Sequence, residues 1–73
     1  MEFSYNGIVI LLKKDLNENN DMFIKRGNFI IKNIKSINNF NELVTLSYIY
    51  IYYTFYNCIY NKDLLDKIKN LQY

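Results

Sequence analysis

The apolar positions of residues 1–12 alternate on either side of an Asn-Gly dipeptide. Asn6-Gly7 between two apolar runs is a strong signal for a β-hairpin with a two-residue turn. Such a turn pairs Tyr5 with Ile8. It also places alternate apolar residues on one inward face of the sheet: Phe3, Tyr5, Ile8, Ile10 and Leu12. The pattern therefore predicts two antiparallel strands at the start of the chain.

Two further apolar segments follow a polar, Asn-rich stretch over residues 15–21. Residues 22–25 and 28–34 are rich in aromatic and β-branched side chains, which favour strands. Residues 26–28 contain a glycine and an asparagine, as is typical of a tight turn. The first half of the chain is thus predicted to form an antiparallel sheet of three to four short strands over about residues 1–34.

The second half has the spacing of a helix. Asn39 is a candidate N-cap, and Glu42 stands in the capping-box position. From there, apolar residues recur every three or four positions: Leu43, Leu46, Tyr50, Tyr53, Tyr56, Tyr60, Leu64, Ile68 and Leu71. A long or kinked helix over about residues 42–72 is predicted, with Asn61 at the kink or as a second cap. With the sheet, it gives a single α+β domain over residues 1–73.

Residues 48–52 carry conflicting signals. Tyrosine and isoleucine alternate there with the period of a strand, and both residue types favour strands. However, the apolar run that contains them is too long for a typical strand and has no internal turn signal. We therefore favour helix, and strand stays the alternative.

The helix segment 43–61 has no charged residue and holds six of the eight tyrosines of the chain. So many rings cannot all face one core, and a small domain rarely leaves a large aromatic patch bare. Tyrosine is also enriched at protein interfaces, because it buries a large area at low entropic cost. We expect a partner-binding surface formed by outward tyrosines with cations at its rim: Tyr48, Tyr52, Tyr53, Lys25 and Arg26.

Composition limits the chemistry of the chain. It has no histidine and only two separate glycines, so it lacks an imidazole base and a glycine-rich phosphate loop. Residues 15–21 have the oxygen spacing of a calcium loop, but Arg26 stands where the closing Glu belongs. Cys58 is the only cysteine, which leaves a zinc site incomplete. We therefore predict a non-enzymatic domain with no metal and no cofactor.

The most frequent residues are Asn, Ile, Lys and Tyr, whose codons are rich in A and T, while Ala and Pro are absent. A small domain without catalytic groups, encoded by an AT-rich genome, is typical of viruses and phages. The leading hypothesis is a virus- or phage-encoded inhibitor, similar to anti-CRISPR proteins, that blocks a host protein complex by contact. Its expected location is the cytoplasm of the host cell, where a lone thiol stays reduced, and a homodimer is a further option.

Two other classes of function stay open. Residues 43–61 reach the lower length limit of a membrane-spanning helix, which would make the chain a membrane-associated protein. Cations and aromatics in residues 23–32 would suit a nucleic-acid-binding module. Neither is preferred, because the tyrosines favour an interface and the net charge is only +2.

Overall fold

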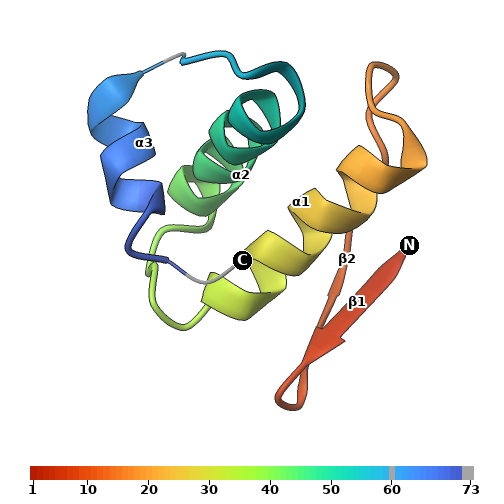
Figure 1. Cartoon of the computed structure of the whole chain (residues 1–73). Helices are drawn as coiled ribbons and strands as arrows, with labels where there is room; N and C mark the ends of the chain where they lie inside the picture. Colours follow the sequence, from red (N-terminus) through yellow and green to blue (C-terminus); the bar gives the residue numbers. More distant parts are fainter. Residues whose placement is uncertain (60, 72–73) are drawn as a thin grey trace.

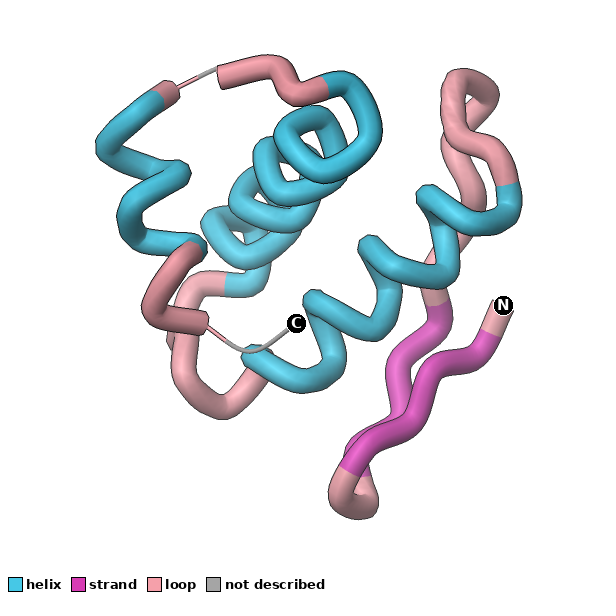
Figure 2. The backbone as a smooth tube through the Cα atoms, in the orientation of Figure 1, coloured by secondary structure: helices cyan, strands magenta, loops and turns pink. Residues whose placement is uncertain are grey.

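The computed structural model describes residues 1–59 and 61–71. It is an α+β domain with an N-terminal two-stranded hairpin followed by three helices (Figures 1 and 2). The elements are β1 (Glu2–Tyr5), β2 (Ile8–Leu11), α1 (Asn20–Asn33), α2 (Phe40–Tyr56) and α3 (Lys62–Ile68). The fold class is therefore the predicted one, with fewer strands and more helices than expected.

The N-terminal hairpin is confirmed in position and register. β1 and β2 are antiparallel, and Tyr5 pairs with Ile8 across the turn. Asn6 has φ 51° and Gly7 has φ 81°. Two consecutive left-handed residues are what a tight hairpin turn requires, and Asn-Gly is the dipeptide that adopts them most readily. The dipeptide thus fixes which side chains face inward.

The predicted strands over 22–25 and 28–34, with their turn at 26–28, are wrong, because these residues form helix α1. The side chain of Asn19 caps the helix by accepting a hydrogen bond from the Met22 amide at 2.9 Å. Gly27 lies within the helix and not in a turn. The buried residues of α1 follow a helical spacing that includes two polar members: Met22, Phe23, Arg26, Gly27, Phe29, Ile30, Ile31 and Asn33.

Helix α2 begins where the sequence predicted and settles the conflict over residues 48–52 in favour of helix. The Asn39 side chain accepts from the Glu42 amide at 3.1 Å. The helix does not continue to residue 72, however. It ends at Asn57, whose backbone is left-handed with φ 51°, and Asn61 then caps the separate helix α3. Residues 60 and 72, which were assigned to the long helix, lie outside the described residues, as does residue 73.

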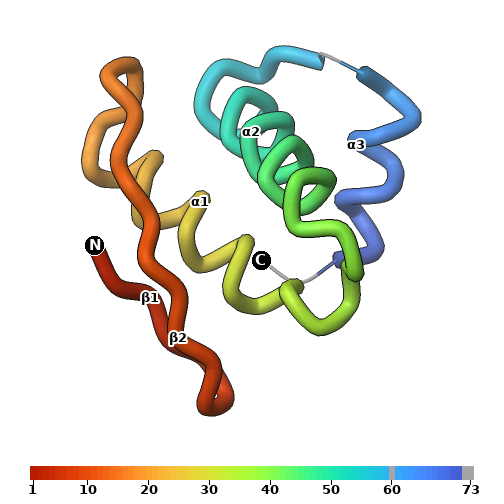
Figure 3. The backbone as a smooth tube through the Cα atoms, turned by 180° about the vertical axis from the view of Figure 1, so that it is seen from behind, coloured from red at the N-terminus to blue at the C-terminus, as the bar shows by residue number. Residues whose placement is uncertain are grey.

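The elements stack side by side in the order of the chain. The hairpin packs on α1, α1 on α2, and α2 on α3 (Figures 1 and 3). The main core lies between the helices: Phe29, Ile30, Leu43, Leu46, Ile49 and Ile68. A smaller core joins the hairpin to α1 through Phe3, Phe23 and Ile31. Of the helices described, none is long and apolar enough to span a bilayer.

Candidate protein-binding surface

Tyr48 and Tyr52 stand one helical turn apart on α2 and separate two hollows of the surface. Both tyrosines line both hollows, and we call this pair the tyrosine ridge. Residues at positions i and i+4 lie on the same face of a helix, so the ridge follows the helix axis. Its two sides differ in chemistry, since one hollow is lined by both polar and apolar groups and the other mostly by apolar ones.

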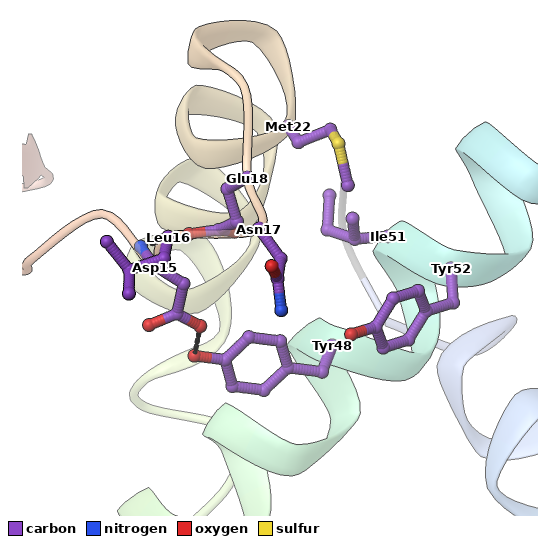
Figure 4. A pocket seen from close by; sticks show the side chains of 8 residues that line it. All are labelled: Asp15, Leu16, Asn17, Glu18, Met22, Tyr48, Ile51 and Tyr52. Carbon is purple, nitrogen blue, oxygen red and sulfur yellow. Dashed lines mark hydrogen bonds between the residues drawn. The ribbon is translucent and has the colours of Figure 1, made fainter.

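The hollow towards α1, which we call the polar pocket, has a volume of about 320 Å³. Its wall is the loop before α1, and its floor includes apolar side chains from both helices. The lining residues are Asp15, Leu16, Asn17, Glu18, Met22, Tyr48, Ile51 and Tyr52 (Figure 4). Asn17 directs its amide into the space between the two tyrosines, whereas Leu16 points away from it. The pocket thus combines aromatic rings with oxygen and nitrogen groups.

Tyr48 is fixed at both its hydroxyl and its ring. The hydroxyl donates a hydrogen bond to Asp15 Oδ2, shown as the dashed line in Figure 4. The guanidinium carbon of Arg26 lies 4.6 Å from the ring centroid, within the range of a cation–π contact. Burial and the hydrogen bond to Asp15 raise the pKa of Tyr48 to about 12. Tyr48 is therefore neutral at physiological pH and held in one orientation.

A buried ion pair supports this arrangement. Arg26 Nε lies 2.6 Å from Glu18 Oε2, and Nη2 lies 3.0 Å from Oε1, which makes the pair bidentate. Glu18 Oε1 also accepts from the Asp15 amide at 3.0 Å. Although burial opposes the charge of Arg26, the hydrogen bond and charge of Glu18 outweigh it and raise the pKa of Arg26. The loop of residues 15–18 is thereby tied to both α1 and α2.

The hollow towards α3, which we call the apolar groove, has a volume of about 510 Å³. Besides the ridge, its lining residues are Thr45, Ile49, Cys58 and Leu64. Farther along α2, the Tyr52 and Tyr56 rings lie 6.1 Å apart between centroids, and the Tyr56 hydroxyl contacts Met22 Sδ at 3.6 Å. Aromatic surface therefore continues from the ridge to the end of α2.

The structure divides the five residues predicted to bind a partner. Tyr48 and Tyr52 lie together, and Tyr52 is 40% exposed. Tyr53 is 38% exposed but lines a separate hollow with Leu65 of α3 and with Lys69, the C-cap of that helix. Lys25 is exposed on α1. Arg26, expected at the rim, is only 2% exposed, because it forms a buried ion pair with Glu18.

Sequence reasoning did not find Asp15 and Glu18 as parts of this surface. Both lie in the polar stretch over residues 15–21, which was compared only with a calcium loop. The structure instead uses the loop oxygens within the protein: Asp15 accepts from Tyr48, and Asn19 caps α1. Over the described residues, no three His, Cys, Asp or Glu side chains lie close enough together to hold a metal ion.

A partly exposed aromatic ridge on a small α+β domain defines a protein-binding domain more readily than an enzyme. The chain belongs to the XRN-Two Binding Domain (XTBD) family, whose model matches residues 12–73. No curated protein and no solved structure matched the chain. The family match begins just after β2, so the hairpin precedes the matched residues.

This membership corrects the predicted function. The hypothesis of a virus- or phage-encoded, anti-CRISPR-like inhibitor is wrong, because the chain belongs to a family defined by binding to XRN-Two. The broader expectation of a protein partner agrees with that family. So does the expectation of a binding domain in place of a catalytic one, at the level of the family.

Proposed function

We propose that this chain binds the exoribonuclease XRN2 and that the tyrosine ridge on α2 is the centre of the contact. The family match over residues 12–73 carries the identity of the partner. The proposed location of the contact rests on the exposure of Tyr52 next to Tyr48, whose hydroxyl is held by Asp15.

The two tyrosines have different roles in this contact. Tyr52 offers its ring and hydroxyl to the partner, and a central tyrosine is a common hot-spot residue. Tyr48 is a positioning residue, since its hydroxyl and one ring face already engage Asp15 and Arg26. A surface that is rigid before binding loses less entropy on association.

The apolar groove supports the same location. It lies directly beside Tyr52 and is lined by Ile49 and Leu64, so it can accept an apolar side chain of the partner. A central apolar contact next to polar groups matches the usual anatomy of protein interfaces. Tyr53 is exposed on α2 and Lys25 on α1, and we propose both as rim residues of the contact.

The test compares two exposed tyrosines in the full chain. Tyr52→Ala removes a ring from the ridge, whereas Tyr5→Ala removes a ring from the hairpin, which precedes the family match. With immobilised XRN2 in a surface plasmon resonance assay, we expect Tyr52→Ala to weaken binding by about 30-fold, the size of a hot-spot loss. Tyr5→Ala should stay within about twofold of the unmodified chain. Equal losses, or none in Tyr52→Ala, would place the contact elsewhere.

A further inference from the structure

The polar pocket contains groups that the fold itself does not use. Asp15 gives one carboxylate oxygen to Tyr48, which leaves Oδ1 for another donor. Within the part of the chain that the structure describes, neither the Asn17 amide nor the Tyr52 hydroxyl has a protein hydrogen-bond partner. Figure 4 shows both directed towards the same space. Free polar groups that converge on one hollow are typical of a recognition site.

The charge around this space is negative. Asp15 and Glu18 line the pocket and no cation does, while the charge of nearby Arg26 is matched by Glu18. The Lys14 ammonium is directed to Asn20 at 3.4 Å. The carboxylate of Asp15 is therefore the uncompensated charge at the pocket, and covering it with a neutral partner would carry a desolvation cost.

We propose that the polar pocket receives a basic side chain of the partner, an inference that rests on the proposed function. The ammonium or guanidinium would pair with the Asp15 carboxylate and lie beside the aromatic rings of the ridge. The aliphatic stem would contact Met22 and Ile51 on the floor. A pocket of about 320 Å³ is at the small end of ligand sites, which suits a single side chain.

The test uses two isosteric substitutions and purified XRN2. Asp15→Asn removes the charge but keeps an oxygen that can accept from the Tyr48 hydroxyl. We expect its affinity for XRN2 to fall by about 10-fold or more at low salt, and by less at high salt. Glu2→Gln is the control, because it removes one negative charge from the exposed hairpin. Its affinity should stay unchanged.

Asn17→Asp adds a carboxylate to the pocket. It is the complementary test, because it probes the pocket by adding a charge and not by removing one. We expect it to tighten binding by about threefold or more if a cation enters the pocket. Tighter binding by Asn17→Asp with weaker binding by Asp15→Asn supports the inference. Unchanged or opposite effects in a chain that still binds XRN2 overturn it and leave the proposed function standing. If the unmodified chain does not bind XRN2, the proposed function fails and the inference with it.

Discussion

The ring of Phe3 occupies the space where a β-carbon on Gly27 would lie. Three ring atoms of Phe3 come within 2.5 Å of that position, which no real side chain could share. Phe3 is buried and makes an edge-to-face contact with Phe23, with 5.4 Å between ring centroids. The hairpin therefore docks on α1 through a glycine that a helix would otherwise avoid.

Gly27→Ala should destabilise the domain, although alanine is the better helix former. Alanine gains about 1 kcal/mol of helix propensity, while forcing a methyl group into a packed core costs about 1–3 kcal/mol. Because the Phe3 ring is buried against Phe23 and Ile31, we expect a net loss of about 1 kcal/mol in the free energy of unfolding. Urea denaturation measures it.

Phe3→Leu provides the matched test of this cause. In the Phe3→Leu background the smaller side chain makes room for the methyl group, so Gly27→Ala should cost less there than in the unmodified chain. The same cost in both backgrounds would show that Phe3 is not the obstacle.

Glu18→Gln should be one of the most damaging single changes in the chain. It leaves Arg26 charged, buried and without its carboxylate, a situation that costs about 3–5 kcal/mol. Glu42→Gln is the control, because it removes a carboxylate from an exposed pair with Lys67 and should cost at most about 1 kcal/mol. Denaturation midpoints of the two variants give the comparison, and similar midpoints would argue against a structural role for the buried pair.

Tyr48 should make the stability of the domain depend on alkaline pH. Its pKa is raised from 10.0 to about 12 in the folded chain by burial and by the hydrogen bond to Asp15. The unfolded chain releases this proton near pH 10 and the folded chain near pH 12. The stabilisation is thus complete below pH 10 and is lost as the pH rises to about 12.

Thermal melts between pH 9 and 12 test this dependence against Tyr48→Phe, which cannot ionise at that position. We expect the melting temperature of the unmodified chain to fall more steeply than that of the variant. All other residues are the same in both proteins, so their contributions to the pH dependence cancel in the comparison. Parallel curves would mean that Tyr48 does not couple to folding.

Asn57→Gly should stabilise the end of α2. Asn57 has φ 51°, a conformation that glycine adopts without steric cost, and its side chain is exposed. We expect a gain of about 0.5 kcal/mol. The same substitution at Asn28, an exposed position inside α1, should instead cost about 0.3–0.5 kcal/mol, because glycine is a poorer helix former than asparagine. A loss of stability in Asn57→Gly would contradict the capping role.

The sequence predicted best where local chemistry decides the structure. Asn6-Gly7 can form few turns other than the one observed, so the hairpin and its register followed. Asn39 and Asn61 both act as N-caps, and Asn61 was recognised as a possible second cap. The break between α2 and α3 was predicted only as a possible kink at Asn61. The actual end of α2 is set by the left-handed backbone of Asn57, which does not alter the hydrophobic pattern of the sequence.

The error in α1 has a tertiary cause. The buried stripe of that helix includes Arg26 and Asn33, whose polarity hid the helical period in the sequence. Arg26 is inside because Glu18 lies eight residues earlier and folds back over it, and Asn33 is satisfied by the Phe29 carbonyl. Gly27 was interpreted as part of a turn, but it lies within the helix, and its lack of a side chain leaves space for the Phe3 ring. Such pairings over a distance cannot be read from local propensity.

Contacts between residues distant in the sequence also determine the candidate binding surface. The tyrosines of α2 were predicted to be contact residues, but the sequence could not tell that Tyr48 and Tyr52 share two hollows while Tyr53 lines a third. The role of Asp15 depends on a hydrogen bond to a residue 33 positions later. Only the fold brings these groups together.

Isothermal titration calorimetry of the full chain with purified XRN2 tests the central claim most directly. We expect saturable heat with one chain bound per XRN2, and loss of most of that heat when Tyr52 is changed to alanine. The absence of any heat or complex at micromolar concentrations, with the chain still folded, would contradict the account.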